Sequence, residues 1–205
     1  MNTQTQTQTQ TQTQTSGPML TSQQIFRKQM AGESLHPDGT DTLQRHVVTV
    51  LVENTLGALN RVANLFSQRG FELESVSVGE AKDQTLRRMT LVTTGNDRMI
   101  GQVLRQLNSL IDTIEVEDVT HFDHIERELC LVQVRCPASE RQVLISVVDI
   151  FRATVVNITP DSLTFEVTGP PAKINAFIGM MRGYDVLEVA RSGRVAMRRE
   201  LAFEH

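Results

Sequence analysis

The sequence predicts an α+β protein with two tandem ferredoxin-like βαββαβ domains behind a polar N-terminal tail. Three observations carry this prediction. Apolar residues recur at every second position in some segments, which is typical of strands, and at every third or fourth position in others, which is typical of helices. The resulting order is strand, helix, strand, strand, helix, strand. The same order recurs in the second half of the chain. Both halves follow a Thr-Gln repeat, Thr3 to Gln14, which is too polar to form a core.

We expect residues 1–45 to be a disordered tail, with one short helical stretch from Ser22 to Met30. The first domain is assigned to residues 46–121, a linker to 122–125 and the second domain to 126–199. Residues 200–205 form a second tail.

The first domain opens with a strand in which Val48, Val50 and Val52 alternate with other strand-forming residues. A loop from Glu53 to Gly57 leads into a helix that ends at Gly70, followed by a strand from Leu73 to Val78. The apolar stripe expected on that helix is Leu59, Val62, Ala63 and Phe66.

A strand from Leu86 to Thr94, a second helix and a strand ending at Val119 complete this domain. The stripe of the second helix is Ile100, Val103, Leu104, Leu107 and Ile111. Both helices should cover one face of the sheet. Because apolar residues alternate on both sides of the first strand, we expect a second copy to cover the other face and predict a homodimer through these domains.

The second half repeats this order. A strand from Leu129 to Arg135, a hairpin of strands 154–159 and 163–168, and a final strand from Asp185 to Ala190 are expected. Its two helical stripes are Leu144, Val147, Val148 and Phe151, then Ile174, Phe177, Ile178 and Met181.

The loop between the first strand and its helix is the candidate binding site. Asn54 can donate and accept hydrogen bonds, and Gly57 allows a ligand to approach the backbone. The N–H groups at the helix start, near Gly57, Ala58 and Leu59, suit a carboxylate. The alternative is that Asn54 to Gly57 is an ordinary turn and helix cap.

Residues that suggest other chemistry have simpler interpretations. His121 and His124 have a metal-like spacing, but no further ligand with zinc-like spacing follows, so we interpret them as a solvated linker and expect no metal. Carboxylates at 115–118 are interpreted as a solvated strand edge and those at 126–128 as a charged, exposed turn. The pairs Arg87-Arg88 and Arg198-Arg199 suit an acidic partner surface or simple solubility. Catalytic motifs such as a nucleophile elbow, a phosphate loop or His-Glu-x-x-His are not found.

Composition restricts the class of partner. A net charge of −4, no Trp and one Tyr argue against nucleic acid as the main partner. Neither a membrane-spanning run nor a signal peptide is visible, so we expect a cytoplasmic protein. Cys130 and Cys136 should lie on one strand about 20 Å apart, too far to bridge, and are expected to be reduced thiols.

The stretch LVENTLGALNRVANLFSQRGFELESVSVG resembles the opening of the acetolactate synthase regulatory (small) subunit, an ACT-domain protein. The segments HIERELCLVQVR, IFRATVVNITPDSLTFEVTG, INAFIGMM and VLEVARSGRVAMRR resemble the C-terminal domain of the same family. The resemblance covers about residues 46–199.

This resemblance implies a non-catalytic subunit that activates the catalytic (large) subunit and confers feedback inhibition by a branched-chain amino acid, with valine as the usual effector. It implies no cofactor in this chain; thiamine diphosphate, Mg and FAD are expected on the large subunit. A stand-alone tandem ACT sensor that regulates another protein is the alternative, and a true enzyme is a third class without a supporting motif.

The resemblance also implies an effector site. Asn54, Gly57 and Ala58 match family positions, and Leu56 and Leu73 would flank the effector side chain. Glu72 departs from the family pattern, which has Asn there and places it in the pocket from the opposing protomer. A glutamate would repel a carboxylate but attract an ammonium group, so we expect weakened or altered valine sensitivity with activation retained.

Overall fold

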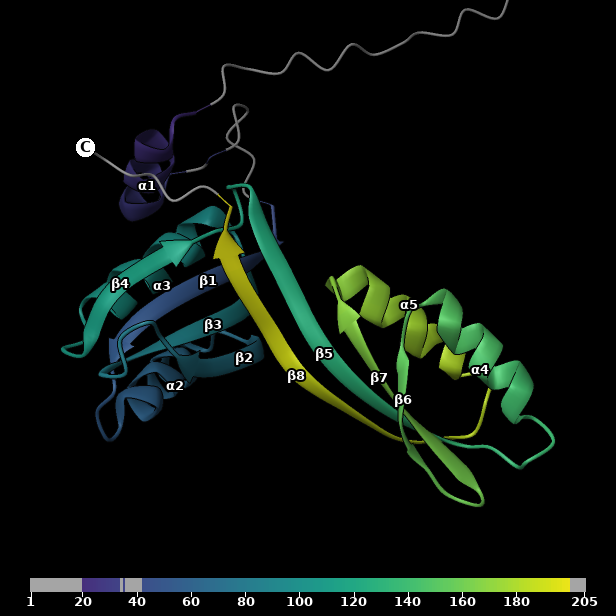
Figure 1. Cartoon of the computed structure of the whole chain (residues 1–205). Coiled ribbons are helices and arrows are strands. Elements are labelled where there is room, and N and C mark those ends of the chain that lie inside the picture. Colours follow the sequence, from purple (N-terminus) through teal and green to yellow (C-terminus); the bar gives the residue numbers. More distant parts are fainter. Residues whose placement is uncertain (1–19, 34, 36–41, 200–205) are drawn as a thin grey trace, which may run out of the picture.

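The computed structural model describes residues 20–33, 35 and 42–199 and contains two four-stranded antiparallel sheets, each covered on one face by two helices (Figure 1). The first unit is β1 (Gln44–Glu53), α2 (Ala58–Arg69), β2 (Leu73–Glu80), β3 (Leu86–Gly95), α3 (Asp97–Asn108) and β4 (Thr113–Asp118), with strand order β2-β3-β1-β4. The second is β5 (His124–Arg135), α4 (Arg141–Ile150), β6 (Thr154–Ile158), β7 (Ser162–Gly169), α5 (Pro171–Met181) and β8 (Val186–Arg198), with order β6-β7-β5-β8. The predicted α+β fold with two ferredoxin-like units is confirmed.

The core of the first unit lies between its sheet and α2 and α3. Val48, Val50 and Val52 point into it as their alternation predicted. The predicted face of α2 is partly wrong, because Leu59 and Ala63 are exposed. The buried positions are Ala58, Val62 and Phe66. They also obey helical spacing, so the period alone could not decide which of two overlapping stripes faces the sheet.

The second unit has an equivalent core. Its centre is made of Leu144, Val148, Ile174, Phe177 and Met181, all from the two predicted stripes. Ile111, by contrast, lies beyond the end of α3 and is exposed. Cys130 and Cys136 are free and buried, and burial raises the pKa of both thiols.

Strand β8 is longer than predicted. It continues past Ala190 to Arg198 and pairs with β5 as far as His124, so the two strands form a long ribbon that connects the units (Figure 1). The predicted exposed turn at 126–128 is therefore wrong: these residues lie in β5, and Glu128 is buried. Opposite charges replace apolar alternation in this part of the ribbon, and the Arg191 guanidinium donates to both Glu128 carboxylate oxygens at 2.6 and 2.7 Å.

The C-terminal part of β8 lies across the helix-free face of the first sheet. Ala196 packs into a small core with Val47, Val92 and Val119. The backbone N–H groups of Arg194 and Ala196 donate to the hydroxyl groups of Ser75 and Thr90 at 3.2 and 3.4 Å. The chain itself therefore covers much of the face that we expected a second copy to cover, and this face no longer supports the predicted homodimer.

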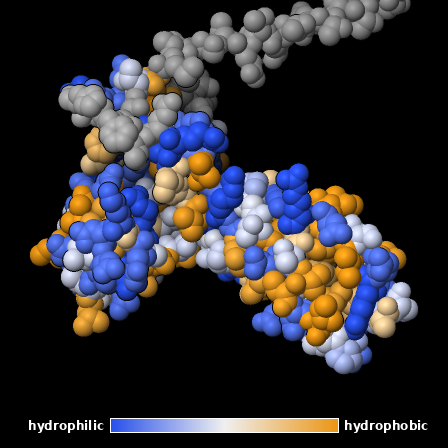
Figure 2. Space-filling model, in the orientation of Figure 1, coloured by the Kyte–Doolittle hydropathy of each residue, from blue (hydrophilic) through white to orange (hydrophobic). Residues whose placement is uncertain are grey.

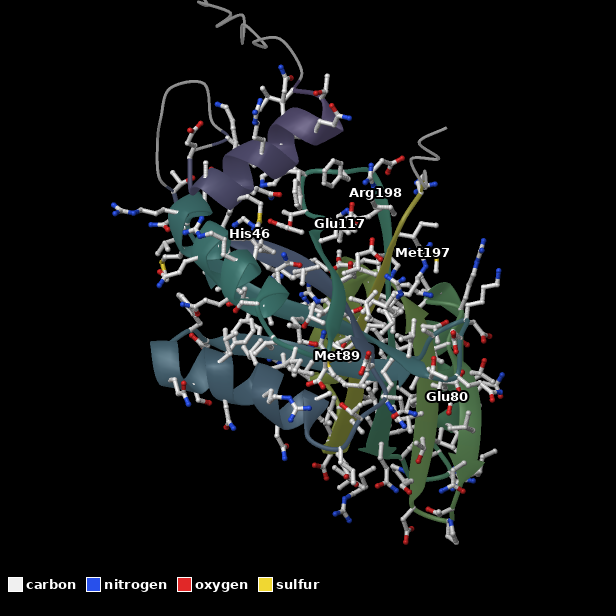
Figure 3. All side chains as sticks on the ribbon, turned by 90° about the vertical axis from the view of Figure 1, so that its left-hand side faces the viewer. His46, Glu80, Met89, Glu117, Met197 and Arg198 are labelled. Carbon is white, nitrogen blue, oxygen red and sulfur yellow. The ribbon has the colours of Figure 1, made fainter. Side chains whose placement is uncertain are left out.

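Gly193 permits this close approach. Its φ is +76°, and a Cβ atom there would lie 2.8 Å from the Ser75 hydroxyl and 3.2 Å from the Val76 carbonyl oxygen. At the far side of the sheet, the Arg198 guanidinium reaches the Glu117 carboxylate at 2.6 Å (Figure 3). Glu117 thus contacts the other unit rather than only solvent.

Helix α1 (Ser22–Ala31) packs on α3 of the first unit, where the Arg105 guanidinium donates to the Met30 carbonyl at 2.5 Å. It agrees with the helix predicted from Ser22 to Met30, although it lies in the stretch assigned to a disordered tail. The Thr-Gln repeat and the tail 200–205 lie outside the described residues. In the described part of the chain, no helix is long and apolar enough to span a bilayer.

Candidate ligand-binding site

The start of the loop from Glu53 to Gly57 is held in place by two backbone hydrogen bonds. The N–H of Glu53 donates to the Asp112 carbonyl at 2.8 Å, and the N–H of Asn54 donates to the Thr85 carbonyl at 2.7 Å. Gly57 has a φ of +90° and is the residue before α2, which has no side-chain cap. The left-handed backbone at Gly57 thus turns the chain sharply into the helix.

An ion pair stiffens the loop from the helix side. The Arg61 guanidinium binds the Asp112 carboxylate, and Asp112 also accepts a hydrogen bond from the Thr55 hydroxyl at 3.1 Å. The Arg61 hydrogen bond lowers the pKa of Asp112; burial opposes this and the Thr55 bond adds to it. The loop is therefore built before a ligand arrives, which limits the entropy that binding would cost.

The Asn54 side chain points to a residue that the sequence did not assign to the site. Its carbonyl oxygen accepts a hydrogen bond from the Arg87 guanidinium at 2.6 Å. Arg87 comes from β3 and had been interpreted as part of a partner surface or as a residue that aids solubility. Nothing in the local sequence distinguished it from Arg88, which alternation places on the opposite face of the sheet.

A hollow of about 350 Å³ is surrounded by the loop, the start of α2 and the Arg87 side chain. Val78 and the buried Met89 form its apolar part. Leu56 and Leu59 lie at the rim and are 100% and 45% exposed. The residues lining the hollow include five of the seven predicted site residues, namely Asn54, Leu56, Gly57, Ala58 and Leu59. A guanidinium, a helix N-terminus and an apolar wall together suit a small ligand that carries one carboxylate.

The two remaining predicted residues lie at the other end of the sheet. Leu73 pairs with Thr93, whereas the loop follows Glu53, which pairs with Leu86. Seven residues of strand separate these positions by about 23 Å. Glu72 is exposed, and Leu73 packs at the border of the core. One chain therefore does not bring Glu72 and Leu73 to the loop.

A second hollow, of about 470 Å³, lies between β2 and β8. Its charged groups bind one another: Arg45 pairs with Glu74 at 2.8 Å and Arg191 pairs with Glu128. Since these guanidinium groups already have carboxylate partners, we prefer the loop hollow as the ligand site.

The histidine pair and the acidic strand edge differ from their predicted roles. His124 lies in β5, and its Nδ1 is 2.8 Å from the Phe122 carbonyl. His121 instead lies beside His46, with ring centroids 5.9 Å apart. Asp118 is buried rather than solvated, and its carboxylate is 2.8 Å from Nδ1 of His46. No local pattern could reveal this pair, because 72 residues separate its members.

Comparison with known proteins agrees with this architecture. The sequence model described as an AHAS small subunit-like ACT domain matches residues 48–115, and the model described as the small subunit of acetolactate synthase matches residues 127–200. The first unit, which carries the loop hollow, is therefore an ACT domain.

Relatives extend the match to nearly the whole folded region. The probable acetolactate synthase small subunit of Archaeoglobus fulgidus is 47% identical over 155 residues, 76% of this chain and 97% of the relative. The acetolactate synthase small subunit of Aquifex aeolicus is 43% identical over 163 residues, 79% of this chain and 85% of the relative. The crystal structure of the Thermotoga maritima small subunit superposes with a TM-score of 0.71 at 33% identity, covering 78% of this chain and 99% of that one. The chain belongs to the acetolactate synthase small subunit family.

Proposed function

We propose that this chain is the regulatory subunit of an acetolactate synthase in branched-chain amino-acid biosynthesis. It binds the thiamine-dependent catalytic subunit, raises its activity and confers feedback inhibition by a branched-chain amino acid, with valine as our first candidate. The observation that carries the effector part is the loop hollow, where Arg87 and the start of α2 face an apolar wall of Val78 and Met89. The family membership supports the association with a catalytic subunit.

The ligand chemistry follows from the lining. The carboxylate of an amino acid would accept hydrogen bonds from the α2 start and from Arg87, and its branched side chain would contact Val78 and Met89. A second copy would bring Glu72 to this site, because the loop and Glu72 lie at opposite ends of the first sheet within one chain. Its negative charge would repel the effector carboxylate, so valine would bind less tightly than beside the Asn of the family pattern. The complete site is thus proposed to form between two copies.

The test measures acetolactate formation by the cognate catalytic subunit, with and without this chain and with and without valine. We expect this chain to raise acetolactate formation and valine to abolish that rise. If this chain raises acetolactate formation and valine does not change that rise, activation is supported, and either Glu72 has abolished the response to valine or the effector is a different one. Absence of any rise would reject the proposal and favour a stand-alone amino-acid sensor.

A further inference from the structure

A side-chain cluster unrelated to the loop hollow lies at the opposite end of the first sheet. His46 comes from the start of β1, Asp118 from the end of β4 and His121 from the segment that follows. One ligand atom of each residue lies within 4.8 Å of those of the other two. Figure 3 shows His46 at the end of the domain where α1 packs.

Asp118 is fixed by several donors. One carboxylate oxygen accepts from the backbone N–H and the hydroxyl of Thr120 at 3.0 and 2.5 Å. The other is 2.8 Å from Nδ1 of His46 and accepts from the Gln29 amide of α1 at 2.9 Å. A carboxylate in this position holds the proton on Nδ1 and leaves the lone pair on Nε2 of the same ring.

That second nitrogen has no protein partner. The His46 side chain is 1% exposed, and its Nε2 is buried without a hydrogen-bond partner among the described residues. Buried polar atoms are nearly always bonded, so an exception indicates a bound water or ion that completes the site. The centroid of the His121 ring lies 5.9 Å from that of His46. A carboxylate that binds one nitrogen of a histidine is also the arrangement that orients metal-binding imidazoles.

We propose that His46 and His121 bind one divalent transition-metal ion of the Zn²⁺ class. Asp118 orients His46 and places a negative charge beside the ion, and water completes the coordination because His121 is only partly buried. Imidazole ligands favour Zn²⁺, Co²⁺ or Ni²⁺ over Mg²⁺ and Ca²⁺, which prefer oxygen. The ion would fasten β1 to the segment that leads into the β5–β8 ribbon.

The alternative for the same residues is that the contact between His46 and Asp118 only joins β1 to β4 and that the cluster binds no metal. The two accounts differ in one measurable quantity, the stoichiometric uptake of a metal ion by the folded chain.

The experiment uses the full chain without an affinity tag, stripped with EDTA. Zn²⁺ is titrated by calorimetry, and Co²⁺ is added to record its visible absorption. We expect one equivalent bound, a tetrahedral Co²⁺ spectrum and a higher melting temperature with Zn²⁺. His121→Ala should weaken binding by about tenfold or more and remove the Zn²⁺-dependent rise.

The matched control is His124→Ala. His124 lies three residues away in the same segment but outside the cluster, so this variant should bind as the unmodified chain does. Because His121 is partly exposed, His121→Ala should fold, which circular dichroism in EDTA verifies. The proposal is overturned if the unmodified chain takes up no stoichiometric metal, if His121→Ala binds equally well, or if His124→Ala loses binding.

Discussion

Arg87 shows what a single residue adds to the candidate site. Five of the predicted positions line the hollow, and all five are local to one loop, where a strand, a glycine and a helix start follow one another in the sequence. Arg87 arrives from a different strand, and its contact with Asn54 spans 33 residues. Local reasoning finds the backbone part of such a site, but a side chain from a neighbouring strand requires the strand register.

Replacing Arg87 tests its role in ligand binding. Arg87→Ala should weaken valine binding by about tenfold or more, because a charge-assisted hydrogen bond to the carboxylate is lost. Calorimetry on the assembled complex measures this. Arg88→Ala is the control, since it changes the same charge on the opposite face of β3. Equal loss in both variants would mean that only net charge matters.

Glu72 allows a second test at the residue scale. Glu72→Asn restores the residue of the family pattern and removes a negative charge that repels the effector carboxylate. We expect valine to inhibit the Glu72→Asn complex at lower concentrations than the unmodified one, with activation unchanged. Inhibition curves for both proteins give the answer. Equal, tight valine binding by both would exclude a role for Glu72 in sensitivity.

The Asp112–Arg61 pair makes the loop sensitive to acid. The pKa of Asp112 is lowered by the Arg61 hydrogen bond, so its charged form favours the folded state. This contribution is complete above the ordinary carboxyl pKa of about 4 and is lost as the pH falls through the lowered value. Asp112→Asn should therefore be less stable than the unmodified chain at pH 7, with a gap that narrows below about pH 4. Urea unfolding at several pH values measures the gap, and a constant gap would contradict the assignment.

Among the elements, β8 shows where sequence patterning fails. The sequence predicted the first part of β8 as a strand because its apolar residues alternate. The Arg-Ser-Gly-Arg stretch at 191–194 has no apolar alternation. The strand continues in the structure because Glu128 and Glu126 of β5 bind Arg191 and Arg194 of β8 diagonally across the ladder. The paired charges lie 63 and 68 residues apart in the sequence. Cross-strand ion pairs, rather than alternating apolar residues, therefore stabilise this part of the strand.

Gly193 is the position where this element is most easily disturbed. Gly193→Ala should lower the free energy of unfolding by about 1–2 kcal/mol, because a left-handed backbone disfavours a Cβ atom and that atom would meet Ser75. The control is Gly179→Ala in α5, where a Cβ meets nothing within 4 Å and the helix gains propensity. Urea denaturation of both variants is the measurement. Similar stability in the two would show that β8 does not need the left-handed turn.

In the whole molecule, the fold of each unit could be predicted from the sequence, whereas the contact between the two units could not. The two βαββαβ units followed from local periodicity, and the helix order followed with them. The way the units meet did not, because it depends on hydroxyl groups of Ser75 and Thr90 that receive backbone N–H groups from β8. For the same reason, local periodicity did not reveal that β8 packs on the sheet face where we expected a second copy, and the homodimer stays a prediction.

The candidate site nevertheless requires two copies if Glu72 contributes to it. We expect sedimentation to show a dimer, and valine binding to weaken on dilution below the dimer dissociation constant, because each site needs a loop from one copy and β2 from another. The Glu72→Asn variant should keep the same dimer, since only the ligand contact changes. Full valine affinity in a monomeric sample would exclude a shared site.

The contact between β8 and the first sheet has a further consequence, for aggregation. The outer edge of β8 is the side of a sheet on which another strand could add, and exposed edges of this kind nucleate intermolecular β-structure. Here Ser75 and Thr90 occupy the N–H groups of Arg194 and Ala196, so this edge is blocked by side chains of the neighbouring domain. Separation of the two domains would free these two N–H groups, so we expect the separated domains to associate through this part of the edge more readily than the docked ones.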